Sequence, residues 1–175
     1  MKIKFSITDP ASIDAAVDKL SDYLGGFDNK CRRFLERLAQ IGVDTASVSF
    51  ASAAYDGVND VTVNPPQWLN ENALIVSASG SSITFIEFGA GVYNTGVHPL
   101  AGELGMIRGG YGKGYGKRRQ WGYYDNGGGL TAGGKRLSNG VVLTKGNDAN
   151  RSMYNASREM RQKIIGIARE VFGSG

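Results

Sequence analysis

The sequence contains a single cysteine, Cys31, and a single histidine, His98, among its 175 residues. One cysteine excludes an intrachain disulfide framework, and these two residues cannot form a structural zinc site without help from carboxylates. Only four prolines are present, which excludes a collagen repeat or a proline-rich spacer. We therefore expect neither a disulfide-rich nor a zinc-stabilised domain, and no cofactor.

Long hydrophobic runs are also absent. No stretch approaches the roughly 18 apolar residues of a membrane span, and the N-terminus, Met-Lys-Ile-Lys-Phe-Ser, lacks the apolar core of a signal peptide. From this we expect synthesis in a reducing cytoplasm and no membrane partner. Hydrophobic residues make up 41 % and charged residues 21 % of the chain, close to the values of globular proteins. The length suits one domain, spanning residues 1–175.

Glycine, by contrast, is abundant and unevenly placed. The chain has 26 glycines, of which 18 lie in the 58 residues from Gly89 to Gly146. The same segment has eight Lys or Arg and two acidic residues, a balance of +6, whereas the rest of the chain has a balance of −2. The net charge of +4 therefore comes from one glycine-rich basic insertion at about 89–146, carried by a slightly acidic body.

The spacing of apolar residues predicts two N-terminal helices. Asp9 and Pro10 are typical of a helix start, and apolar side chains then recur at helical spacing. We expect Gly25-Gly26 to end this helix and Asp28 to cap a second one. On the second helix Cys31 lies on the apolar face, so we interpret it as a small buried apolar residue rather than a nucleophile.

Three strands are expected after these helices. Val58 to Val63 predicts a short strand, and Ala73 to Ser79 and Ser82 to Phe88 predict a hairpin around a turn at Gly80-Ser81. The insertion then shows little alternation before Val141-Val142-Leu143, a further short strand. Loops of this length in compact domains are usually functional or disordered.

A long C-terminal helix is the clearest element. It spans about Ala149 to Phe172, with an apolar stripe on one side and a cap at Asn147 or Asp148. The predicted fold is therefore α+β. A small antiparallel sheet packs against two N-terminal helices and the long C-terminal helix, with the glycine-rich insertion between them.

No catalytic constellation is evident. Gly129 to Lys135 matches part of a phosphate-binding loop, but Arg136 stands where Ser or Thr must bind magnesium, and no apolar strand precedes it. His98 precedes Pro99 in a loop, where a conformational or hydrogen-bonding role is favoured over metal ligation. Glu87 lies on an apolar stretch, where it can cap a helix, pair with an arginine or face a neighbouring subunit. A hydrolase using Glu87 or His98 is a minor alternative; we expect no enzyme.

The most distinctive local feature is the alternation of basic and aromatic residues over 108–121. Arginine and tyrosine are common in protein interfaces, while Lys, Arg and aromatic rings also suit nucleic acids. A protein interface, a nucleic-acid contact and a solvated loop all stay open. The candidate residues for a subunit interface, a neighbouring-ring interface or a DNA channel are Glu87, His98, Arg108, Tyr111, Lys113, Tyr115, Lys117, Arg118, Arg119, Trp121, Tyr123 and Tyr124.

Several motifs in order resemble a bacteriophage family. They are Ile86-Glu87-Phe88-Gly89-Ala90-Gly91, then His98-Pro99, then Gly122-Tyr123-Tyr124, and finally the stretch from Gly146 to Ala156. The family is the tail-component family typified by gene product ten of HK-type lambdoid phages, functionally similar to lambda minor tail protein Z. Ala90 stands where the family usually has Thr, and Asp148 and Ser152 stand where it usually has Pro.

The resemblance implies a structural protein of the virion. It implies a neck, tail-terminator or tail-completion subunit at the head–tail junction, made in the bacterial cytoplasm. Such subunits form a homo-oligomeric ring, expected to be hexameric, around a channel through which DNA passes. The implied partners are the head connector or stopper and the tail tube or terminator proteins. The alternative function is nucleic-acid binding by the basic-aromatic loop.

Overall fold

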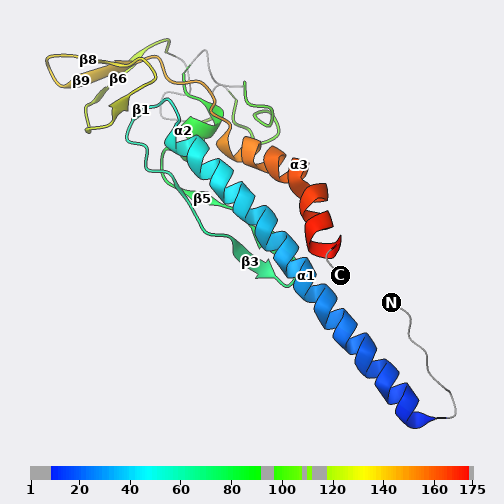
Figure 1. Cartoon of the computed structure of the whole chain (residues 1–175). Coiled ribbons are helices and arrows are strands. Elements are labelled where there is room, and N and C mark those ends of the chain that lie inside the picture. The colour runs from blue at the N-terminus through cyan, green and yellow to red at the C-terminus, as the bar shows by residue number, and fades with distance from the viewer. Residues whose placement is uncertain (1–8, 92–96, 108–109, 112–117, 174–175) are drawn as a thin grey trace.

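The computed structural model of the chain describes residues 9–91, 97–107, 110–111 and 118–173 (Figure 1). Its helices are α1 (Pro10–Ala51), α2 (Ile83–Phe88) and α3 (Ser152–Gly173). Its strands are β1 (Asp56–Gly57), β2 (Thr62–Val63), β3 (Gln67–Asn70), β4 (Ala73–Ile75), β5 (Ala78–Ser79), β6 (Trp121–Tyr124), β7 (Gly129–Leu130), β8 (Lys135–Arg136) and β9 (Val141–Thr144). Helices thus occur with small antiparallel sheets, which confirms the α+β class.

α1 is one helix of 42 residues, so the expected division into two N-terminal helices is wrong. It begins as predicted, because the Asp9 side chain accepts a hydrogen bond from the N–H of Ala11 and Pro10 follows the cap. Gly25 and Gly26 lie inside the helix, with open space where a side chain would stand. A glycine costs a helix about 1 kcal/mol relative to alanine. This cost is too small to end α1 there, because the part of α1 that follows the glycines is held by its packing against the rest of the chain.

The predicted hairpin is also wrong. The stretch from Ser82 to Phe88 forms α2 rather than a strand, and β5 pairs with β2 while β4 pairs with β3. Of the strand expected over 58–63, only β2 forms. Side-chain and backbone hydrogen bonds from Ser81 and Ser82 to Asp60 fix the start of α2. The apolar residues on both sides of this stretch belong to one short helix whose last three residues are buried.

The described part of the glycine-rich segment belongs to the folded body. It contains the three-stranded sheet β6-β9-β8, and its β7 pairs with β1 from the first half of the chain. The strand predicted at 141–143 is confirmed as part of β9, whereas the expected lack of strands before it is wrong. A Cβ on Gly128 would lie 2.1 Å from the backbone of Gly57, so glycine there allows the close approach of the two segments.

α3 packs antiparallel against α1. At one end of the contact, the Ser49 hydroxyl donates to the Ser152 hydroxyl at 3.0 Å. At the other end, the ring of Phe172 lies 5.8 and 5.9 Å from the rings of Phe27 and Phe34. The helix predicted over about 149–172 is confirmed, although it begins at Ser152. The Asn147 side chain donates to the Phe85 carbonyl, so it does not act as the predicted cap.

The hydrophobic core lies where the three helices meet. Its buried members are Ala46 and Phe50 from α1, Ile86 from α2 and Ala156 from α3. Beyond this region the N-terminal part of α1 extends past the C-terminal end of α3 (Figure 1). Among the described residues, no helix combines the length and apolarity needed to cross a membrane.

Candidate functional site

Glu87 caps the start of α3 from a distant part of the chain. Its carboxylate accepts hydrogen bonds from the backbone N–H groups of Met153 at 2.9 Å and Tyr154 at 3.0 Å. The first N–H groups of a helix have no acceptor within the helix, and negative charge is favourable there. Capping was one of the three roles considered for Glu87, and the structure confirms it.

His98 lies against the same carboxylate. Its Nε2 is 3.2 Å from Glu87 Oε1, and its Nδ1 accepts the N–H of Leu100 at 3.1 Å. Because Nδ1 accepts a hydrogen bond, the ring proton lies on Nε2, which donates it to Glu87. The ring also packs against Phe88 and Tyr154, with centroids 4.5 and 5.4 Å away. The predicted hydrogen-bonding role of His98 is confirmed.

Three of the four short motifs of the sequence meet around this pair, whereas Gly122-Tyr123-Tyr124 lies in β6. Ala90 and Asn147 donate a backbone hydrogen bond to each other, and the N–H of Asn150 donates to the carbonyl of Ile86. The end of α2, the His-Pro loop and the entry to α3 are therefore in direct contact. We call this region the motif junction; it comprises Ile86, Glu87, Ala90, His98, Asn147, Asn150, Met153 and Tyr154.

The motif junction is closed to a substrate. Glu87 is 4 % exposed and His98 is 3 % exposed. Both carboxylate oxygens and both ring nitrogens already have hydrogen-bond partners within the chain. This pair can hold backbone groups in place, but it does not reach a molecule in solvent. Both residues are therefore internal to the chain, whereas the sequence predicts them as candidates for an interface.

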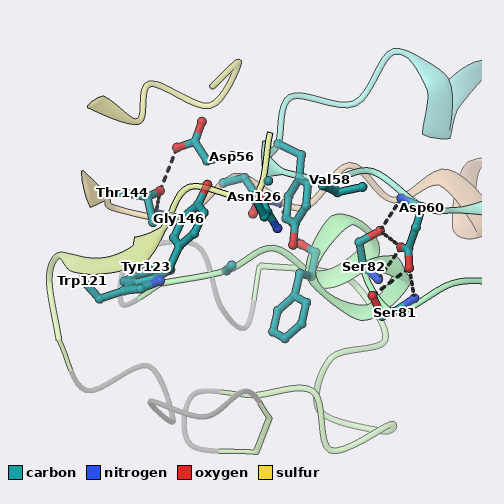
Figure 2. A pocket seen from close by; sticks show the side chains of 15 residues that line it. Asp56, Val58, Asp60, Ser81, Ser82, Trp121, Tyr123, Asn126, Thr144 and Gly146 are labelled. Carbon is teal, nitrogen blue, oxygen red and sulfur yellow. Dashed lines mark hydrogen bonds between the residues drawn. The ribbon is translucent and has the colours of Figure 1, made fainter. Parts of the chain in front are cut away.

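A pocket of about 480 Å³ lies beside the motif junction and shares Ala90 and Asn147 with it. Its aromatic lining residues are Tyr55, Phe85, Trp121 and Tyr123. Figure 2 shows Trp121 and Tyr123 on one side of the pocket and Asp60 with its serine partners on the other. Asp56 also belongs to the lining. The pocket thus combines aromatic faces with two acidic side chains.

Both acidic side chains of the pocket have structural partners. Asp60 accepts hydrogen bonds from the hydroxyls and N–H groups of Ser82 and Ser81, which hold its pKa well below the usual range. Asp56 accepts the N–H of Ala132 at 2.9 Å and the hydroxyl of Thr144 at 2.7 Å. Asp60 therefore connects the segment before β2 to α2, and Asp56 connects β1 to the glycine-rich segment.

The pocket tyrosines are uncharged phenols at neutral pH. Burial is the main cause that raises the pKa of Tyr55, and the nearby Tyr123, Asp60 and Asp56 raise it further. Burial is also the main cause that raises the pKa of Tyr123. Asp56 and Asp125 raise it further, and Arg136 lowers it. Aromatic faces beside carboxylates suit a cationic or aromatic group. Within the described part of the chain, no group of three or more His, Cys, Asp or Glu could hold a metal ion.

The remaining interface candidates fall into four groups. Four lie outside the described residues: Arg108, Lys113, Tyr115 and Lys117. Three are exposed: Arg118, Arg119 and Tyr124. Trp121 and Tyr123 are half-buried in the pocket wall. The hydroxyl of Tyr111 donates to the carbonyl of Gly89, and burial raises its pKa to about 12.

Sequence reasoning missed Asp56 and Asp60. Asp60 binds Ser81 from 21 residues away, and Asp56 binds Thr144 from 88 residues away. Neither spacing follows a helical or strand period, so no local pattern could indicate these contacts. Two features of the sequence offered a clue to Asp60. Asp60 is an acidic residue within an apolar stretch, and the expected turn at Gly80-Ser81 offers N–H and hydroxyl groups that a carboxylate can accept.

Comparisons of the chain with protein-family models, with curated proteins and with solved structures find no match. Its function is therefore inferred from its own residues and their geometry.

Proposed function

We propose that this chain is a structural subunit of a tailed bacteriophage, a neck or tail-completion protein that caps the tail tube and joins it to the head connector. In this role it forms a ring around the DNA channel. The observation that best supports the proposal is the motif junction. Three of the four motifs that resemble the phage family come from separate parts of the sequence, yet Glu87, His98 and the entry to α3 are in contact. Contact between them is expected if they are the shared core of a fold.

The use of the acidic residues also supports a structural role. Glu87 holds two N–H groups of α3, Asp60 holds the start of α2, and Asp56 connects β1 to the segment that follows α2. An assembly subunit needs such a firmly connected body together with exposed contact surfaces, and it needs no reaction centre.

Exposed apolar side chains provide contact surfaces at two places. One is the N-terminal part of α1. The other is the segment 97–107, which follows α2; its exposed apolar side chains are Val97, Leu100, Leu104 and Ile107. Exposed apolar patches of this kind are typical of sites that associate with other proteins.

Genetic inactivation in the phage that encodes the chain tests the proposed function. We expect filled heads and finished tails that stay unjoined in electron micrographs, and a wild-type copy supplied from a plasmid should restore joined particles. A plasmid copy that lacks residues 109–119 should not restore joined particles, whereas a copy with the exposed Lys163→Ala change in α3 should restore them.

Joined, infectious particles in the absence of the gene would refute the proposal. Rescue by the deleted copy would show only that 109–119 is not the joining contact.

Nucleic-acid binding is the second candidate function. Arg118 and Arg119 are exposed immediately before the half-buried Trp121, an arrangement that suits phosphate contacts next to an aromatic ring. Direct phosphate binding weakens steeply as salt rises from about 50 to 200 mM. A titration of the isolated protein with DNA therefore tests this candidate, and the lack of any binding at low salt rejects it.

A further inference from the structure

The pocket beside the motif junction has acidic side chains in its lining and no basic ones. None of the described residues that line it is Lys, Arg or His. Asp56 and Asp60 form no ion pair with another described residue. Their hydrogen bonds come from serine and threonine hydroxyls and from backbone N–H groups. These donors are neutral, so the pocket keeps a negative charge that favours a cation and opposes a phosphate or a carboxylate.

The charge of these carboxylates reaches the phenols inside the pocket. Beyond the effect of burial, the charges of Asp60 and Asp56 raise the pKa of Tyr55. Beyond the effect of burial, the charge of Asp56 likewise raises the pKa of Tyr123. Neither phenol hydroxyl has a hydrogen-bond partner within the described part of the chain. The two phenols therefore offer oxygens that can accept N–H groups, at a place where a positive charge is favourable.

Aromatic rings surround the same space. Four of them line the pocket, those of Tyr55, Phe85, Trp121 and Tyr123. Figure 2 shows Trp121 and Tyr123 together on the side of the pocket opposite Asp60. The faces of such rings attract cations, and that of tryptophan does so most strongly. The chain contains one such contact elsewhere, since the guanidinium of Arg32 lies 4.6 Å from the ring centroid of Trp68. The volume of about 480 Å³ is within the range of small-molecule sites.

We propose that this pocket binds a guanidinium group. The group is planar, carries only donors, stacks on aromatic rings and is more weakly hydrated than an ammonium group. It would lie against the ring of Trp121 and donate its N–H groups to the hydroxyl oxygens of Tyr55 and Tyr123. A neutral planar group would use the rings but would gain nothing from the negative charge.

The guanidinium can belong to a free small molecule or to an arginine side chain of a protein, because both present the same planar cation. Binding in this pocket does not require the proposed place in a virion. It is measured on the isolated full chain, so it can fail while the phage experiment succeeds, and the reverse.

The test follows the indole N–H signals of the two tryptophans by NMR. The probe is Nα-acetyl-arginine amide, whose only charge is its guanidinium, and the control ligand is the uncharged Nα-acetyl-citrulline amide. We expect the probe to shift the Trp121 signal saturably, with a Kd of about 1 mM, and to leave the Trp68 signal in place. The control ligand should bind at least about 10-fold more weakly.

Two adjacent tyrosines of β6 provide a matched pair of variants. Tyr123→Leu removes a ring and an oxygen from the pocket, so it should weaken binding at least about 10-fold. Tyr124 is 82 % exposed and does not line the pocket, so Tyr124→Leu should leave the affinity unchanged. Backbone N–H spectra verify that each variant is folded.

A second measurement needs no variant. Saturation of the wild-type chain with the probe should lower the pKa of Tyr55 and of Tyr123, because a nearby positive charge favours the phenolate. NMR of labelled tyrosine rings follows both phenols as the pH is raised. The control ligand should leave both pKa values unchanged.

The proposal is overturned by a Trp121 signal that stays in place up to about 50 mM probe, or by equal binding of the citrulline compound. A folded Tyr123→Leu variant that binds as tightly as wild type would contradict it, and so would an equal loss in Tyr124→Leu. Sedimentation with and without the probe distinguishes the two sources. Self-association that the probe reverses assigns the guanidinium to a second copy of this chain, whereas a monomer that binds the probe assigns it to another molecule. Both results support the pocket as the binding site.

Discussion

His98 donates its Nε2–H to the carboxylate of Glu87 across 3.2 Å, and both side chains are buried. The same carboxylate accepts the N–H groups of Met153 and Tyr154, so one anion serves both the loop that holds His98 and the start of α3. A buried carboxylate is tolerated when it is this fully hydrogen-bonded. The pair therefore connects three segments that are distant in the sequence.

Glu87→Gln should destabilise the fold. An amide has one accepting oxygen, so at least one N–H group of α3 loses its buried acceptor, at a cost of roughly 1–3 kcal/mol. Urea unfolding measures this change, and hydrogen exchange should show reduced protection at Met153 and Tyr154. Glu103→Gln, at an exposed glutamate, is the matched control and should change stability little. Unchanged exchange at both amides would contradict the capping role.

The imidazole of His98 should carry a proton on Nε2 and none on Nδ1. The N–H of Leu100 donates to Nδ1, which can accept only when it is unprotonated. Nitrogen NMR shifts of the imidazole distinguish the two neutral tautomers and the charged ring. A ring protonated on Nδ1 would show that this hydrogen bond does not form in solution.

Asp60 should make stability depend on pH in the acid range. Its pKa is lower in the folded chain, so the unfolded chain binds more protons between the two pKa values and stability rises with pH there. The contribution is therefore complete above the unfolded pKa of about 3.9 and is lost as pH falls through the folded pKa. Asp60→Asn should lower Tm at pH 7, and the difference from wild type should shrink below about pH 4. Asp148→Asn, at an exposed aspartate, is the control, and a Tm difference independent of pH for Asp60→Asn would contradict this account.

Substitution of glycine by alanine should stabilise the chain in α1 and destabilise it at Gly146. Gly25→Ala and Gly26→Ala should raise helix content, since both sites are helical and open, with a gain of up to about 1 kcal/mol each in local stability. Gly146→Ala should destabilise by at least about 2 kcal/mol, because its Cβ would lie 1.8 Å from the Ala90 carbonyl oxygen. Gly127→Ala, with a positive φ but open space, is the control for backbone strain alone. Circular dichroism and urea unfolding measure both effects.

The elements predicted correctly are those with a long or strongly apolar local pattern. The stripe of α3 and the run at Val141 to Leu143 needed no knowledge of distant residues. The stretch from Ser82 to Phe88 forms a helix rather than the predicted strand, because contacts with Asp60 and with the core around Ile86 determine its conformation and both are tertiary. The Gly25-Gly26 pair does not end the helix as predicted. The low helix propensity of glycine is a local cost, and it is smaller than the stabilisation that one continuous helix gains from its packing.

The same distinction applies to the candidate site. Capping by Glu87 was among the roles considered, and hydrogen bonding by His98 was expected. Their pairing, and the contact with Met153 across 66 residues of sequence, depends on the fold as a whole. Contacts between residues so far apart in the sequence leave no helical or strand periodicity by which they could be predicted.

The two backbone hydrogen bonds between Ala90 and Asn147 have a consequence for how the chain can vary. They bring the points where the glycine-rich segment leaves and rejoins the helical body next to each other. The entropy of closing a loop changes only slowly with its length. Changes of length within this segment that keep His98 and Tyr111 in place can therefore leave both ends where they are. A change of partner would then require new residues within the segment and no redesign of the helices that support it.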